Sequence, residues 1–127
     1  MEGKHYVLVH GASGGAWCWF KLKPKLKSSG NKVSVLDLAA SGIHPKRIQD
    51  VANFAEYCEP LLDLLGSLPE SEKVVLVGHS FGGMCISLAM EKFPHKIALA
   101  VYIAAFAPDT QHPPSYVMEQ VWLTNIS

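Results

Sequence analysis

The sequence predicts one α/β domain built on a doubly wound, mostly parallel sheet with about four strands and three helices. Two observations carry this prediction. Apolar runs alternate with helical segments along the chain, and these runs are continuously apolar rather than alternating in polarity. Strands that are apolar on both faces are typical of a parallel sheet that helices cover on both sides. The expected strands are residues 6–9, 33–37, 74–77 and 98–107.

Three helices are expected between the strands. The first begins near Ala16, is interrupted or restarted at Pro24, which lacks an N–H donor, and ends at Gly30. The second covers residues 51–65, where apolar side chains recur at spacings of three and four. The third covers about residues 80–92 and is apolar nearly all round, so we expect it to be buried on several sides.

Composition narrows the class of protein. The 127 residues include 11 basic and 11 acidic side chains, and 49% are hydrophobic. These values fit one globular domain, residues 1–127, rather than a disordered chain. A formal net charge of zero gives no electrostatic case for binding nucleic acid or an anionic membrane surface. The longest apolar run, residues 97–107, is shorter than the ~20 residues that span a bilayer.

The cysteines and the N-terminus predict a cytoplasmic location. Cys18, Cys58 and Cys85 are odd in number and fall in expected helices, which indicates small buried residues in a reducing compartment rather than a disulfide framework. The chain starts with polar residues followed at once by a strand, so a secretory signal is not expected. No metal or cofactor is predicted.

The segment Gly78-His79-Ser80-Phe81-Gly82 is the most informative motif. It matches Gly-x-Ser-x-Gly between a strand and a helix, the arrangement that presents a nucleophilic serine at the carboxyl end of a sheet. Side chains at the two glycine positions would collide in such a sharp turn. Ser80 is therefore the predicted nucleophile, and the backbone N–H of Phe81 is a predicted donor to an oxyanion.

A second glycine-rich turn, residues 10–15, also joins a strand to a helix. It can supply a second oxyanion donor from the backbone of Ala12, while Gly11 lets the chain approach a substrate carbonyl closely. His10 and His79 flank the two turns, and we expect them to shape the pocket or to bond to backbone.

A dinucleotide-binding unit is the alternative interpretation of the same turn. A strand, a glycine-rich turn, a helix and a strand ending in Asp37 form its outline. The sequence of the turn fits the dinucleotide-binding fingerprint G-x-G-x-x-G poorly, because Ser13 occupies its middle glycine position and Ala16 its last.

From Lys4 to about Gln120 the chain resembles the plant methylesterase and hydroxynitrile lyase group of the α/β-hydrolase superfamily. The shared motifs are HGA at 10–12, GAWCW at 15–19, LDLAASG at 36–42, GHSFGG at 78–83 and AAFAPD at 104–109. The resemblance implies a serine carboxylesterase for small methyl esters of hormone-type acids such as jasmonate, salicylate or indole-acetate. It also implies Ser80 as nucleophile. Lyases of this group carry a threonine where Gly11 stands, so the esterase branch is favoured.

Two departures from the group pattern bear on activity. Gly14 stands where the group usually has a histidine, and residues 121–127 no longer resemble the group. We therefore expect a partial hydrolase core without the cap and C-terminal strands. In this fold the catalytic acid and histidine follow the serine in chain order, so both are expected beyond residue 127. The chain itself is then weakly active, or a non-catalytic remnant that binds a small apolar acid.

Substitutes for the missing base and acid are few. Asp109 and His112 follow the fourth expected strand on the correct edge of the sheet, which makes them a possible surrogate pair; the preferred interpretation is that they begin the cap. We interpret His5, His44 and His95 as surface residues.

Overall fold

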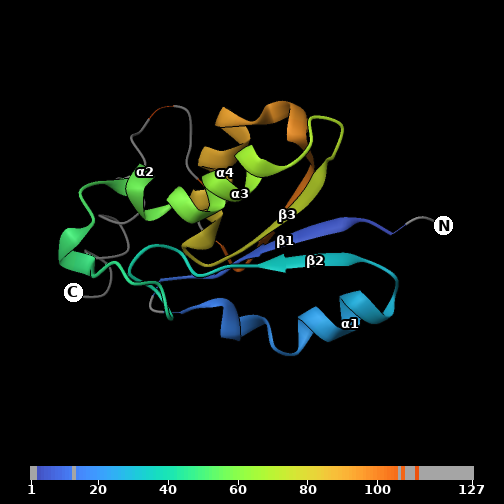
Figure 1. The fold of residues 1–127 in the computed structure, drawn as a ribbon, viewed down its shortest axis with the longest axis horizontal. Helices are drawn as coiled ribbons and strands as arrows, with labels where there is room; N and C mark the ends of the chain where they lie inside the picture. The colour runs from blue at the N-terminus through green and yellow to red at the C-terminus, as the bar shows by residue number, and fades with distance from the viewer. Residues whose placement is uncertain (1–2, 13, 106, 108–110, 112–127) are drawn as a thin grey trace.

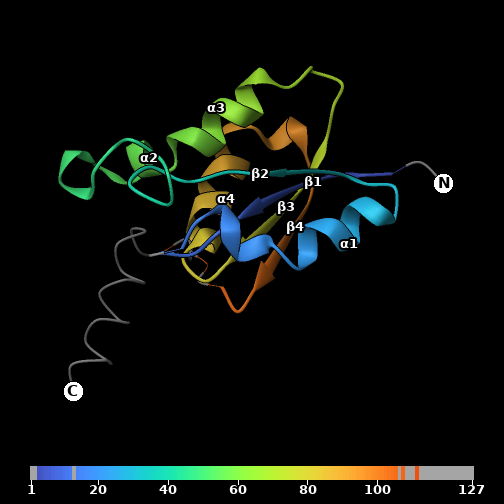
Figure 2. The same cartoon turned by 60° about the horizontal axis from the view of Figure 1, so that its bottom comes forward.

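A four-stranded parallel sheet forms the centre of the fold. The computed structural model describes residues 3–12, 14–105, 107 and 111. The strands lie in the order β2-β1-β3-β4, and every pairing is parallel (Figure 2). They are β1 (His5–Val9), β2 (Lys32–Val35), β3 (Val74–His79) and β4 (Ile97–Ile103). The predicted parallel sheet is confirmed.

Helices cover both faces of the sheet, as the doubly wound prediction requires. α1 lies on one side, and α3 and α4 lie together on the other (Figure 1). The α-helices are α1 (Leu22–Ser28), α2 (Phe54–Tyr57), α3 (Glu59–Ser67) and α4 (Gly82–Lys92). Short 3-10 helices are η1 (Ala16–Trp19), η2 (Ile48–Asp50) and η3 (Pro94–Lys96).

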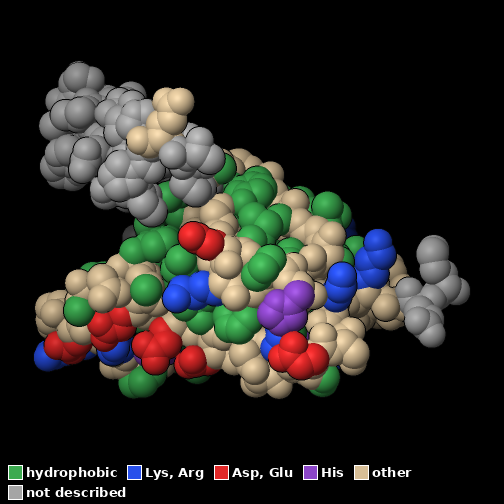
Figure 3. Space-filling model, turned by 90° about the horizontal axis from the view of Figure 1, so that it is seen from above, with side chains coloured by type: hydrophobic (Ala, Val, Ile, Leu, Met, Phe, Trp, Pro, Cys, Tyr) green, Lys and Arg blue, Asp and Glu red, His purple; other side chains and the backbone are tan. Residues whose placement is uncertain are grey.

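The core has two parts, one on each side of the sheet. The larger part joins Val7, Val9 and Leu76 to buried side chains of α3 and α4. The smaller part joins Leu8, Val75 and Val77 to Trp19 and to the half-buried leucines of α1. Successive strand residues therefore face opposite layers, and both layers are apolar, which explains the continuous apolar runs. On the side of the molecule where α3 and α4 lie, hydrophobic side chains remain at the surface beside charged ones (Figure 3).

Two expected helices have different limits in the structure. The helix expected over residues 51–65 is two helices, α2 and α3, which meet at Cys58. Asn53 caps α2 by accepting a hydrogen bond from the Glu56 N–H (2.8 Å), and Pro60 stands at the start of α3, where its missing N–H costs nothing. The helix expected from Ala16 is interrupted as predicted, but the break falls at residues 20–21, between η1 and α1. Pro24 lies within the first turn of α1, where N–H groups have no intrahelical acceptor.

Two surface and burial expectations are also wrong. Cys18 is exposed on the short η1, whereas Cys58 and Cys85 are buried and free as expected. A hydrogen bond between the Cys58 and Cys85 thiols, together with burial, raises the pKa of Cys85. His5 is not a surface residue. It is buried at the amino-terminal edge of the sheet, and its imidazole forms hydrogen bonds with Ser34 and Glu72.

The buried His5 predicts loss of stability in mild acid. Burial lowers the pKa of His5 below its ordinary 6.5, more than the hydrogen bond with Glu72 raises it. Between these two pKa values the unfolded chain binds more protons than the folded chain, so the free energy of unfolding decreases as pH falls through this window. Urea unfolding at pH 7.5, 6.5 and 5.5 measures this slope. The variant His5→Gln should show a shallower slope, and an equal slope in both proteins would contradict the assignment to His5.

Candidate active site

Ser80 lies in a sharp, strained turn between β3 and α4. Its φ is 54°, in the left-handed region that residues with side chains seldom adopt. The Ser80 N–H donates to the carbonyl of Ile103 on β4 (3.3 Å), and the Ser80 carbonyl accepts from the Gly83 N–H (3.1 Å). These two backbone hydrogen bonds, to β4 and to the first turn of α4, therefore fix the conformation of the Ser80 turn. The half-buried Ser80 stands at the carboxyl end of the sheet, where the motif predicts a nucleophile.

The two glycines of the motif are required by backbone crowding. A Cβ on Gly78 would lie 2.9 Å from the backbone of Gly82, and a Cβ on Gly82 would lie 2.6 Å from the carbonyl oxygen of Val9. Neither obstacle is a flexible side chain, so the backbone would have to move. The predicted collision is confirmed, and Gly82 in addition brings the start of α4 against the end of β1.

The first glycine-rich turn meets the Ser80 turn directly. β1 and β3 are paired neighbours, with Val9 opposite Gly78, so the turns that follow them share one edge of the sheet. A Cβ on Gly11 would lie 2.9 Å from Cβ and 3.4 Å from Oγ of Ser80. Gly11 therefore lets the two turns touch at the hydroxyl.

The His10 side chain links the backbone of the first glycine-rich turn to the backbone of Leu38. Its side chain is fully buried, and its Nε2 accepts a hydrogen bond from the Leu38 N–H (3.0 Å). The neutral ring then carries its proton on Nδ1, which donates to the carbonyl of Gly11 (2.7 Å). Both ring nitrogens are bound to backbone, which agrees with the backbone-binding role expected for His10.

The position of the Gly11 carbonyl sets the direction of the Ala12 N–H. The carbonyl accepts hydrogen bonds from His10 and from the Gly14 N–H (3.1 Å). In a planar trans peptide the C=O and the following N–H point in opposite directions. The Ala12 N–H therefore points away from His10 and Gly14. The backbone N–H of Phe81 lies at the start of α4, where N–H groups lack intrahelical acceptors and the helix dipole favours negative charge.

Ala12 and Phe81 line one pocket of about 520 Å³. Its other lining residues come from the loop after β2 and from the η2–α2 segment, and most are apolar: Ala40, Ser41, Ile48, Val51, Asn53, Phe54 and Tyr57. The Phe81 ring packs against Phe54 and Tyr57, with ring centroids 5.6 and 5.9 Å apart. Sequence reasoning missed these aromatic contacts, although the three-residue spacing of Phe54 and Tyr57 was a signal. Burial raises the pKa of Tyr57.

Other candidate residues lie away from this pocket. The exposed His79 packs edge-on against Trp19, with ring centroids 6.4 Å apart. His95 is exposed as expected and pairs with Glu70 (3.2 Å) just before β4, at the edge of the sheet opposite Ser80. His44, expected at the surface, is half-buried, and its Nδ1 accepts from the Lys46 N–H (3.1 Å). Asp109 and His112 lie outside the described residues.

Asp37 bears on the dinucleotide alternative. One carboxylate oxygen accepts from the Ala16 N–H (2.7 Å) and the other from the Ile43 N–H (3.3 Å). The carboxylate thus ties two loops together, whereas a dinucleotide site needs it for a ribose hydroxyl. Within the described part of the chain, no three His, Cys, Asp or Glu side chains are grouped to hold a metal ion. No helix there is both long and apolar enough to cross a membrane.

Comparisons with known proteins agree with this geometry. The family model described as the alpha/beta hydrolase family matches residues 6–124. The chain is 58% identical over 118 residues to methylesterase 2 of Arabidopsis thaliana, covering 92% of this chain and 45% of that protein. It is 53% identical over 124 residues to norfluorocurarine synthase 2 of a Strychnos species, covering 98% and 47%. The chain spans about half the length of the curated relatives it matches.

A solved structure gives the same result. The crystal structure of polyneuridine aldehyde esterase superimposes with a TM-score of 0.92 at 50% identity, covering 97% of this chain and 48% of that one. The curated polyneuridine aldehyde esterase of Rauvolfia serpentina is 52% identical over 119 residues, covering 94% of this chain and 45% of that protein. The predicted resemblance to the plant methylesterase group is confirmed.

The crowding at Gly82 predicts opposite effects of two glycine-to-alanine substitutions. Gly82→Ala should lower the free energy of unfolding by about 1–3 kcal/mol, because the new methyl group forces β1 and α4 apart. Gly66→Ala is the matched control. Gly66 lies in α3, and among the described residues a Cβ there would meet only the Phe93 ring, at 3.7 Å. Stability should therefore rise by about 0.5–1 kcal/mol. Chemical denaturation measures both, and a neutral Gly82→Ala would contradict the crowding argument.

Proposed function

The chain belongs to the alpha/beta hydrolase family, and on this premise we propose that it carries the nucleophile and oxyanion-binding turns of a serine carboxylesterase. The single observation that carries the proposal is the contact between the two glycine-rich turns at Ser80. It gathers a strained serine, a helix start and a second backbone turn at one edge of the sheet. Ester hydrolysis by a serine needs these elements together.

In this proposal Ser80 attacks the ester carbonyl and the two turns stabilise the negative charge that develops on its oxygen. The N–H of Phe81 donates from the start of α4, and the N–H of Ala12 donates from the turn that His10 holds. Fixed donors of this kind contribute about 2.7–4 kcal/mol each to the transition state. Support for pairing them comes from the pocket, which both residues line.

The substrate class follows from the pocket beside these donors. Its predominantly apolar lining and its volume of about 520 Å³ suit the acid part of a small ester whose acid is mainly hydrocarbon. We assign small methyl esters of hormone-type acids such as jasmonate, salicylate or indole-acetate, in line with the methylesterases among the relatives. Gly11 leaves room at the hydroxyl of Ser80 for an ester carbonyl.

The general base and its acid are assigned outside the described residues. A hydroxyl at its ordinary pKa is a weak nucleophile without a base. Among the described residues that follow Ser80, the one histidine is His95, which lies at the opposite edge of the sheet. His112 with Asp109 remains the surrogate pair to test. Where triad members are lost, donors and binding alone still give about 10³–10⁴-fold acceleration over water.

Labelling with a fluorophosphonate probe tests the nucleophile. The probe should label the folded chain at Ser80, and Ser80→Ala should remove the label. Ser87→Ala is the matched control on α4: the Ser87 hydroxyl already lies 2.8 Å from the Gly83 carbonyl, so labelling should not change. Peptide mass spectrometry locates the modified residue.

Two outcomes separate the esterase from the binding alternative. Labelling that persists in Ser80→Ala would contradict Ser80 as nucleophile. A chain with a folded circular dichroism spectrum and no label would favour the non-catalytic interpretation, in which the apolar pocket binds a small acid. Thermal stabilisation by salicylate, measured in the same preparation, would then support that interpretation.

A further inference from the structure

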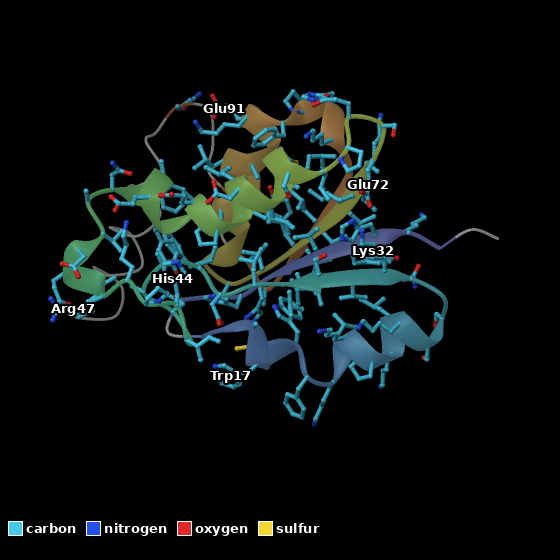
Figure 4. The ribbon with its side chains drawn as sticks, in the orientation of Figure 1. Trp17, Lys32, His44, Arg47, Glu72 and Glu91 are labelled. Atoms are coloured by element: carbon cyan, nitrogen blue, oxygen red, sulfur yellow. The ribbon has the colours of Figure 1, made fainter. Side chains whose placement is uncertain are left out.

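A hydrogen-bonded network of a serine, a histidine and a carboxylate lies at the edge of the sheet opposite Ser80. The hydroxyl of Ser34 on β2 is 2.7 Å from Nε2 of His5 on β1, and Nδ1 of His5 is 3.0 Å from a carboxylate oxygen of Glu72, just before β3. The three residues are far apart in sequence, and the parallel sheet brings them together at its amino-terminal edge. Glu72 and Lys32 lie next to one another at this edge (Figure 4).

The charges around His5 fix the direction of its hydrogen bonds. Burial raises the pKa of Glu72, but hydrogen bonding with His5 and the charge of Lys32 outweigh this and leave it below its ordinary value. Ionised Glu72 can only accept, so Nδ1 of His5 donates to it. Nε2 of the neutral ring is then free to accept the Ser34 O–H. This is the arrangement in which a histidine serves a serine as general base.

Positive charge surrounds this hydrogen-bonded network, and the half-buried Ser34 lies beside the nearby cavity rather than in its lining. A cavity of about 480 Å³ is lined by His5 and Glu72 together with Lys4 and Lys73. Lys32 is exposed, lies 3.5 Å from Glu72, and shares one face of β2 with the half-buried Ser34. An ammonium group in this position can stabilise negative charge that develops on an acyl donor at Ser34.

We propose that Ser34, His5 and Glu72 form a second nucleophilic site, separate from Ser80, at which Ser34 accepts the acyl group of an activated aryl ester. The Ser34 oxygen forms a bond to the carbonyl carbon, and its proton passes to Nε2 of His5. The bond from the carbonyl carbon to the aryl oxygen breaks, and the phenol leaves with the proton from His5. Ser34 stands within a strand rather than at a helix start, so we expect a stable acyl-serine instead of turnover.

The test uses the Ser80→Ala protein with p-nitrophenyl acetate, so that the result does not depend on the proposed esterase site. Release of p-nitrophenol gives the rate, and peptide mass spectrometry gives the position of the acetyl group. Ser34 should be acetylated about 10²-fold or more faster than Ser67 in the same chain. Ser67 is the internal control because its hydroxyl donates to the Leu64 carbonyl (2.7 Å) and has no imidazole partner among the described residues.

A second variant tests the carboxylate. Glu72→Gln keeps the shape of the side chain and removes its charge, so acetylation of Ser34 should slow by about tenfold or more. Ser67 should be unaffected, and circular dichroism confirms that the variant is folded. Acetylation of Ser34 no faster than of Ser67, or unchanged in folded Glu72→Gln, would overturn the proposal. Failure of fluorophosphonate labelling at Ser80 would contradict the proposed esterase site but would not affect the proposal for Ser34.

Discussion

The close approach of two backbone turns at the carboxyl edge of the sheet is the constraint on which the rest of the structure depends. The start of α4 lies so near the end of β1 that no side chain fits at Gly82, and Gly11 touches Ser80 for the same reason. Such contacts leave no freedom for the strand–helix turn. The strain at Ser80, with its φ of 54°, persists because packing on both sides over-determines the backbone.

This constraint couples the candidate site to distant parts of the chain. His10 joins the first turn to the backbone of Leu38, and Asp37 joins the start of η1 to the loop after β2. The aromatic contacts of Phe81 add α2 to the same assembly. The pocket wall is therefore built from segments that meet only in the folded state, and each is held by a polar or aromatic contact.

The two edges of the sheet carry different chemistry. At the carboxyl edge, backbone N–H groups and an apolar pocket surround a serine. At the amino-terminal edge, Glu72 and Lys32 lie beside His5, and Glu70 lies beside Lys96. Lys96 is 2% exposed, and its ammonium donates to the carbonyls of Leu65 and Leu68 (2.9 and 3.0 Å), which satisfies the end of α3.

The sequence by itself determined the parallel sheet, the helices on both faces and the turn at Ser80. Apolar runs and glycine spacing are local signals, and local sterics enforce them. Only the tertiary structure decided the break between α2 and α3, the burial of His5 and Lys96, and the ring contacts of Phe81. A histidine or lysine near a strand looks the same in sequence whether it faces solvent or a buried hydrogen-bond acceptor. The acceptor for Lys96 is the Leu65 carbonyl, 31 residues away, and the partner of His5 is Glu72, 67 residues away. Only the folding of the sheet brings each pair together.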